Sequence, residues 1–245
     1  MIPIVPSPIE PGPLVYGHRG ARAHAEENTV EAFRLAIEQG ADGVELDAWL
    51  TQDAHIVVYH DDRHPSLGWI TECSLRELRR ADPSIPTLDE AFAAVPAPSY
   101  VDLELKNGHR GPAFDRSRHL AAAVMPIIDA HGMAERVLIS SFDPLMVRKA
   151  HRLRPDVLTG LLLTPTDPRH AIQWAAAAGH ATVNVHRSWL AEDGAQLVAE
   201  AAAAGLAVCV WTVNDPAEVV AAAEAGAAVL ITDDPAMAVQ ALSAR

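Results

Sequence analysis

The sequence predicts an α/β protein folded as a closed (β/α)8 barrel, or TIM barrel, and three observations support this fold class. Short apolar runs alternate with alanine-rich segments of helical pattern along most of the chain, and such alternation favours a parallel sheet. The strand–helix units number eight once one hairpin is set aside. The length of 245 residues suits one barrel-sized domain. We therefore expect a single domain over residues 1–245.

The expected barrel strands are apolar runs that end near Gly17, Asp47, Leu105, Ser141, Leu163, Val185, Thr212 and Thr232. Between them lie helical patterns such as NTVEAFRLAIEQG, PLMVRKAHRLR, PRHAIQWAAAAG, AQLVAEAAAAG and PAEVVAAAEAG. Several of these patterns end in glycine, as helices often do. An open doubly wound sheet is the alternative architecture, but the GxGxxG nucleotide fingerprint that usually follows a strand in that fold is missing.

A ninth strand-like run, HIVVYHD, follows the strand that ends near Asp47 with no room for a helical crossover. It must therefore return antiparallel, as a hairpin that turns near Gln52–Asp53–Ala54. Residues 61–86 then leave the hairpin and re-enter the barrel wall, with a short helix around SLRELRRA. We interpret this segment as a short flap inserted after the second barrel strand, above the strand ends.

The composition excludes several classes of function. The chain has 32 acidic and 19 basic residues and a formal net charge of −13, so it repels phosphate backbones and no nucleic-acid partner is expected. Cys73 and Cys209 lack the spacing of a disulfide framework or a zinc ribbon, which fits a reducing compartment. The N-terminal MIPIVPSPIEPGP lacks a signal pattern, and no run approaches about 20 apolar residues. We expect a cytoplasmic protein without stable membrane anchoring, and the oligomeric state stays open.

Carboxylates gather at the ends of two consecutive strands, and active sites of eight-stranded α/β barrels lie at the carboxyl ends of the strands. Glu45 and Asp47 in GVELD share one strand face, and Asp102, Glu104 and Lys106 in VDLELK share another. If Glu45, Asp47 and Glu104 converge, they cannot all stay ionised in a partly buried mouth without a counter-charge. A hard divalent cation, Mg²⁺ or Ca²⁺, is the natural one. The alternative is that these acids are solvated or pair with Lys106 and nearby arginines.

Two histidines are candidates for acid–base chemistry because of their positions. His18 ends the first strand in VYGHRG, and the predicted hairpin brings His60 back beside Glu45 and Asp47. Imidazole titrates near neutral pH, so two histidines that flank a metal can share proton transfer. The chain has twelve histidines, most of which must be surface or structural residues. Their place at strand ends beside the acids distinguishes these two.

Two further residues are candidates for substrate contact. Lys106 is one of only two lysines against seventeen arginines, and its compact charge suits a phosphate oxygen. Neutralisation of Glu104 is the alternative role, and the two roles are compatible. Trp211, in VCVWTVN, ends another strand and is either core or a wall of the site.

The segment EENTVEAF predicts the start of a helix. Asn28 is a good N-cap residue, and Glu31, three residues later, completes the pattern of a capping box. This local role is sufficient to explain Asn28, Thr29 and Glu31.

Taken together, these residues resemble the glycerophosphodiester phosphodiesterase family. The match runs in order through YGHRG, EENT, VELD, VVYHD, IPTLDEAF, LELK, SSF, VWTVN and LITDDP. HRG alone is a weak signal, whereas HRG followed by ENT, ExD, HD and ExK at these separations is a strong one. The resemblance implies eight site residues: the metal ligands Glu45, Asp47 and Glu104, the acid–base pair His18 and His60, and the phosphate- or substrate-binding Arg19, Lys106 and Trp211.

The resemblance implies metal-dependent hydrolysis of a glycerophosphodiester to glycerol 3-phosphate and an alcohol. The net charge of −13 and the short segment 61–86 favour a small, soluble substrate. Family members typically carry a longer insertion between the HD and PTL motifs, where this chain has only DRHPSLGWITECSLRELRRADPS. The same barrel could instead act as a lysophospholipase D or a cyclic phosphodiesterase. It could also bind a phosphorylated ligand without catalysis, although the presence of both histidines and all three acids argues against pure binding.

Overall fold

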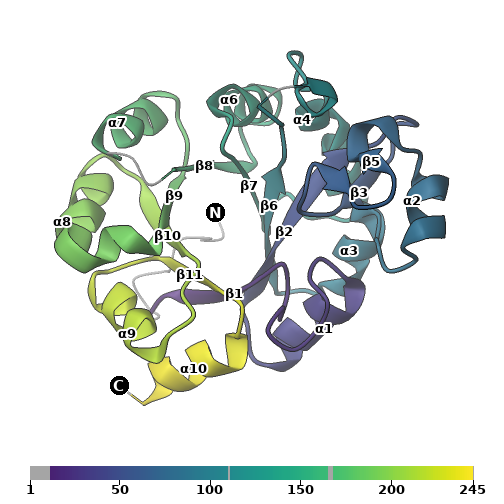
Figure 1. The fold of residues 1–245 in the computed structure, drawn as a ribbon. Coiled ribbons are helices and arrows are strands. Elements are labelled where there is room, and N and C mark those ends of the chain that lie inside the picture. Colours follow the sequence, from purple (N-terminus) through teal and green to yellow (C-terminus); the bar gives the residue numbers. More distant parts are fainter. Residues whose placement is uncertain (1–11, 110, 165–167, 245) are drawn as a thin grey trace.

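A computed structural model describes residues 12–109, 111–164 and 168–244, and in these ranges eight parallel strands close into a barrel (Figure 1). The ring closes where β1 pairs with both β2 and β11. The predicted (β/α)8 barrel is thereby confirmed. The barrel strands are β1 Leu14–His18, β2 Gly43–Leu50, β6 Tyr100–Leu105, β7 Val137–Ser141, β8 Leu158–Leu162, β9 Thr182–His186, β10 Ala207–Trp211 and β11 Val229–Thr232.

Helices surround the barrel and cover its apolar outer face (Figure 1). On α1, Val30–Glu38, the buried Phe33 belongs to one apolar cluster with Val44 and Leu46 of β2, and burying each such side chain contributes about 1.5–3 kcal/mol. This confirms that the two faces of β2 divide into an apolar outer face and a polar inner one. The remaining outer helices are α3 Leu88–Ala94, α4 His119–Ala123, α5 Met125–Ala130, α6 Pro144–Leu153, α7 Arg169–Ala177, α8 Leu190–Ala203, α9 Pro216–Glu224 and α10 Pro235–Ser243.

The predicted hairpin is present and explains why β2 continues past Asp47. β2 pairs antiparallel with β3, Ile56–Val58, in a register that sets Leu50 opposite Ile56. The turn closes with the backbone N–H of Thr51 donating to the carbonyl of His55. β3 therefore lies outside the barrel ring, where it pairs with β2 and its Val57 forms an isolated bridge with Thr87.

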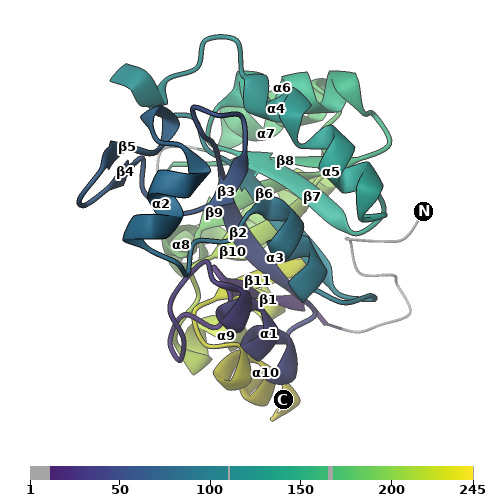
Figure 2. The same cartoon turned by 90° about the vertical axis from the view of Figure 1, so that its right-hand side faces the viewer.

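The segment after the hairpin forms a small unit of its own. β4, Arg63–His64, and β5, Gly68–Trp69, pair as a ribbon that stands out from the barrel beside α2, Leu75–Ala81 (Figure 2). The short helix expected around SLRELRRA is confirmed as α2, capped by Ser74 in a capping box. That residues 61–86 act as a flap above the strand ends stays a prediction.

The barrel interior changes from apolar to polar toward the carboxyl ends of the strands. Its apolar layer contains the fully buried Tyr16 together with Leu138, Cys209, Val229 and Ile231. Beyond this layer, the next inward positions carry carboxylates, histidines and a lysine. None of the helices in the described ranges has the length and apolar character needed to cross a bilayer. Residues 1–11 lie outside these ranges, so the start of the domain and the missing signal pattern stay predictions.

Candidate active site

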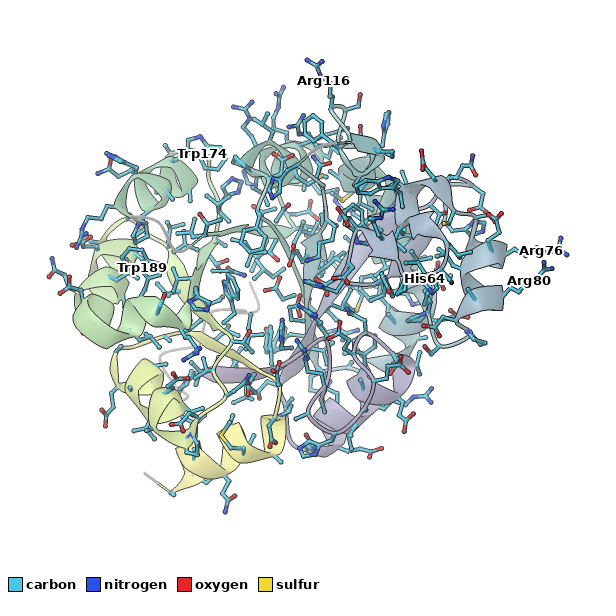
Figure 3. The ribbon with its side chains drawn as sticks, viewed as in Figure 1. His64, Arg76, Arg80, Arg116, Trp174 and Trp189 are labelled. Atoms are coloured by element: carbon cyan, nitrogen blue, oxygen red, sulfur yellow. The ribbon has the colours of Figure 1, made fainter. Side chains whose placement is uncertain are left out.

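A cavity of ≈ 70 Å³ lies at the carboxyl ends of the barrel strands. Seven of the eight residues named from the sequence line it: His18, Arg19, Glu45, His60, Glu104, Lys106 and Trp211. The eighth, Asp47, is only 1% exposed and lies behind Lys106. By contrast, His64 lies on the flap side of the molecule, and Arg76, Arg80 and Arg116 point outward from the rim (Figure 3).

The three carboxylates converge because of strand register. β2 and β6 run parallel with Glu45 opposite Asp102 and Asp47 opposite Glu104. One oxygen from each of Glu45, Asp47 and Glu104 lies within 4.8 Å of the others, and all three side chains are buried. Residues two apart on one strand point to the same face of the sheet, and directly paired residues on neighbouring strands share that face. The convergence of the three carboxylates therefore follows from the alternation seen in the sequence.

The charges in this cluster are unbalanced. Burial raises the pKa of Glu45 well above its usual range, and the charges of Asp47 and Glu104 raise it further. Burial also raises the pKa of Glu104, against the opposing charge of Lys106. Asp47 behaves in the opposite way, because Lys106, Arg19 and His60 outweigh its burial and hold its pKa below the usual range. The cluster therefore has carboxylate oxygens to spare for a further cation.

Within the described ranges, two basic side chains face the acids. The Lys106 Nζ atom lies 2.8 Å from both Asp47 Oδ1 and Glu104 Oε1. Burial would lower the pKa of Lys106, but these two carboxylates raise it, so the side chain stays charged. The Arg19 Nε atom lies 3.4 Å from Asp47 Oδ2, while its Nη1 atom donates to Glu27 at 2.8 Å. Lys106 thus offsets part of the negative charge of the cluster while it lines the cavity.

The HRG turn places Arg19 by its backbone shape. Arg19 and Gly20 both have positive φ, 55° and 83°, and the backbone N–H of Arg19 donates to Glu45 Oε2 at 3.0 Å. A Cβ atom at Gly20 would lie 2.5 Å from the backbone carbon of Ala32. Glycine is therefore required here for both its conformation and its small size.

The prediction for Asn28 is wrong. Thr29 is the N-cap of α1, and its hydroxyl accepts from the backbone N–H of Ala32. Asn28 instead donates from Nδ2 to Asp47 Oδ2 at 2.7 Å, and its Oδ1 accepts from the backbone N–H of Asp47 at 3.3 Å. A residue that looked like a helix cap thus orients a carboxylate of the acid cluster. Local capping rules could not reveal this contact, because Asn28 lies in the turn before α1 and its partner Asp47 lies on β2.

The two histidines lie at the cavity with an aspartate behind each. His18 Nδ1 is 2.6 Å from Asp233 Oδ1, and its Nε2 is 4.0 Å from Glu45 Oε2. His60 Nδ1 is 2.7 Å from Asp61 Oδ1. Burial lowers the pKa of His60, and the charges of Lys106 and Arg19 lower it further, against the opposing effect of Asp47. The sequence alone indicates no role for Asp233, although this residue lies in the LITDDP motif that contributes to the family resemblance.

Aromatic and polar side chains complete the cavity wall. Trp211 makes edge contacts with Phe142 and His186, at ring-centre distances of 5.6 and 5.1 Å. At the floor, Asp102 accepts from Ser140 Oγ at 2.6 Å and from Asn184 Nδ2 at 2.9 Å. Burial raises the pKa of Asp102 to about 7. Trp211 therefore lines the cavity while it also packs against the apolar layer of the barrel.

Space for a substrate extends from this cavity on both sides of His60. One adjoining cavity of ≈ 310 Å³ is bounded by Tyr59 and His64. Another of ≈ 300 Å³ is bounded by Trp49 and Asn107, and His60 lines both. A larger cavity of ≈ 720 Å³ lies beside α1 and the segment 83–86, away from the histidines.

The fold and this cavity define the class of the protein, and comparison with known proteins gives its family. A (β/α)8 barrel whose mouth joins clustered carboxylates to two histidines and a buried lysine has the groups of a hydrolase for charged esters. The Glycerophosphoryl diester phosphodiesterase family matches residues 18–237. The chain belongs to this family and is a phosphoric diester hydrolase.

Individual relatives agree with this assignment. Glycerophosphodiester phosphodiesterase from Caldanaerobacter subterraneus subsp. tengcongensis is 30% identical over 241 residues, which cover 91% of this chain and 94% of that protein. A glycerophosphodiester phosphodiesterase structure from Thermotoga maritima has a TM-score of 0.78 at 27% identity, covering 93% and 97% of the two chains. A phosphodiesterase from Oleispira antarctica, solved in complex with the product sn-glycerol-3-phosphate, has a TM-score of 0.81 at 26% identity, covering 95% and 97%.

Proposed function

We propose that this enzyme hydrolyses small, soluble glycerophosphodiesters to glycerol 3-phosphate and an alcohol. The observation that carries the proposal is a cavity lined by His18, His60 and Lys106 that lies against the cluster of three buried carboxylates. A pure binding site has no use for two histidines placed for proton transfer. The product bound to the Oleispira antarctica relative supports the choice of substrate class.

We propose that Glu45, Asp47 and Glu104 hold a divalent cation, Mg²⁺ or Ca²⁺. The donors fit such an ion, because all are carboxylate oxygens, all are buried, and they lie within 4.8 Å of one another. Burial raises the pKa of Glu45 and the charges of Asp47 and Glu104 raise it further, so a bound cation would favour its ionised form. When bound, the cation withdraws charge from the phosphodiester oxygens.

The roles of the remaining residues follow from their positions. One histidine takes the proton of the nucleophile, and the other returns a proton to the departing alcohol. Lys106 and Arg19 supply positive charge where the phosphate oxygens gather negative charge. Trp211 closes one side of the cavity. The nucleophile is water or a neighbouring glycerol hydroxyl, and the second route passes through a cyclic phosphate.

We also place the enzyme in the cytoplasm, acting on dissolved substrate without stable membrane anchoring. Cys73 and Cys209 are both free and buried, which fits a reducing compartment. A net charge of −13 disfavours docking on an anionic bilayer.

The test is to compare kcat/KM for glycerophosphocholine, glycerophosphoethanolamine and a lysophosphatidylcholine at matched metal concentration. Phosphorus NMR would follow the products. We expect turnover of the two soluble diesters with release of glycerol 3-phosphate. A strong preference for the lysolipid would overturn the substrate class, since it would indicate a lysophospholipase D.

A further inference from the structure

A chain of hydrogen bonds runs from His18 to a residue far from the acid cluster. Asp233, directly after β11, accepts on both sides: Oδ1 faces His18 Nδ1 at 2.6 Å, and Oδ2 accepts from Asn214 Nδ2 at 2.7 Å. Asn214 is itself oriented, because its Oδ1 accepts from the backbone N–H of Asp233 at 2.9 Å and from the Thr232 hydroxyl at 3.3 Å. Arg22 Nε lies 3.8 Å from Asp233 Oδ1.

Each link of this chain has a defined direction. Asn214 Oδ1 accepts from a backbone N–H, so the other end of its amide must be the NH₂ group, which can only donate. An ionised carboxylate can only accept, so Asp233 requires a proton on His18 Nδ1. The tautomer of a histidine is set by the hydrogen bond of one ring nitrogen. His18 Nε2, 4.0 Å from Glu45 Oε2, is then free of hydrogen in the neutral ring.

We propose that Asp233 is a positioning residue that orients His18 and sets its tautomer, and that Asn214 sets the direction of this hydrogen-bond chain. The inference rests on the proposed function, because His18 is taken to exchange a proton with substrate through Nε2. Asp233 touches neither the cavity nor the acid cluster. We therefore expect its effect to reach the reaction through the imidazole ring of His18.

The first test is Asp233→Asn. Because Asn214 still presents its NH₂ group, the new amide at position 233 must turn its oxygen toward Asn214 and its own NH₂ toward His18. His18 Nδ1 must then accept, and the ring proton moves to Nε2. We expect kcat to fall ~10²-fold or more with little change in KM, as for a mis-set catalytic histidine. Nitrogen-15 NMR of the His18 ring should report the inverted tautomer, which a merely structural role would not produce.

The second test reverses the direction of the chain. In the double variant Asp233→Asn with Asn214→Asp, the new carboxylate at position 214 accepts from the amide at position 233. That amide then presents its oxygen to His18, and Nδ1 regains its proton. We expect the double variant to recover most of the lost kcat and the original NMR signature. Asn214→Asp alone sets two carboxylates face to face and should lower kcat.

The matched control is Asp234→Asn. This neighbouring acid pairs with His24 at 3.2 Å and caps α10, Pro235–Ser243, and asparagine is an equally good cap. Its kcat should be unchanged. Full kcat and an unchanged tautomer in Asp233→Asn would overturn the proposal, as would a folded double variant without recovery. Absence of turnover in the wild-type enzyme would contradict the proposed function, while the NMR arm would still decide the positioning role.

Discussion

The two histidines of the active site each have Nδ1 bound to an aspartate, yet the two pairs are built differently. His18 and Asp233 are 215 residues apart and meet where β1 closes against β11. His60 and Asp61 are adjacent in the chain, beyond the hairpin strand β3. The Asp233 side chain is 24% exposed and held by Asn214, whereas the Asp61 side chain is 69% exposed.

His18 is therefore held by a contact that forms when the barrel closes, whereas His60 is held by a contact with its neighbour in the chain. The His18 ring is oriented only in a closed barrel, and its partner is fixed from both sides. The His60 ring is 36% exposed against 13% for His18, and it borders the two larger adjoining cavities. We infer that His18 is pre-organised, while His60 can adjust to the bound substrate.

The largest expected loss of activity comes from removing the cation that we propose at the acid cluster. This loss does not depend on which histidine is the acid and which is the base. Removing divalent cations with a chelator should abolish turnover, and adding Mg²⁺, Ca²⁺ or Mn²⁺ should restore it, since buried carboxylates need a counter-charge. Turnover would be followed by phosphorus NMR, with metal content checked by elemental analysis. Full activity of metal-free protein would contradict the metal site.

Replacing either histidine should be the next most damaging change. We expect His18→Ala and His60→Ala each to lower kcat ~10²-fold or more, as for loss of a general acid or base, with the fold retained by circular dichroism. His119→Ala is the control, because its side chain is 69% exposed and its ion pair among the described residues is with Asp115, four residues earlier. Equal losses in all three variants would mean that the proton chemistry lies elsewhere.

Lys106→Met tests whether this lysine acts on the phosphate. We expect kcat to fall ~10²-fold, as for loss of one preorganised charge, while calorimetry shows retained or tighter cation binding. Tighter binding follows because Lys106 competes for Asp47 and Glu104 at 2.8 Å. Unfolding or loss of metal binding would instead indicate that Lys106 serves as a neutraliser.

Asp61→Asn should have a much smaller effect than Asp233→Asn. Asp61 is exposed, and in the described ranges its side-chain bond is to the adjacent His60, so water can replace it. We expect kcat to fall less than ~10-fold, measured on the same substrate as Asp233→Asn. Equal losses in the two variants would show that exposure does not separate the two pairs.

A third histidine, His180, is expected to affect stability. Replacing it should leave activity nearly unchanged. His180 is buried, its Nδ1 lies 2.8 Å from the Thr159 hydroxyl, and its Nε2 finds no partner among the described residues. Burial lowers the pKa of His180 to about 4, with a further effect from His151. As pH falls, His180 is therefore protonated in the unfolded chain before it is protonated in the folded protein. The free energy of unfolding decreases as pH falls from about 6.5 to about 4.

The measurement is the melting temperature of wild type and His180→Asn between pH 4 and pH 7.5. We expect the acid side of the wild-type curve to fall more steeply, by up to ~3 kcal/mol in unfolding free energy. Parallel curves would show that His180 does not titrate on unfolding.

Local patterns were sufficient for the barrel and for most of the site. A period of two on parallel strands dictates that Glu45, Asp47 and Glu104 face one another, and the missing crossover dictates the hairpin that carries His60. These are consequences of chain geometry over short distances. They could be derived before any strand pairing was known.

Tertiary structure alone decided how those groups are held. Asn28 looked like a helix cap but bonds to Asp47, and Asp233 and Asn214 carried no local signal for His18. Their contacts span 19 to 215 residues, so they exist only once the barrel closes. A hydrogen bond depends on ångström-scale placement of two side chains, and strand patterns determine faces and ends without fixing which distant side chains meet.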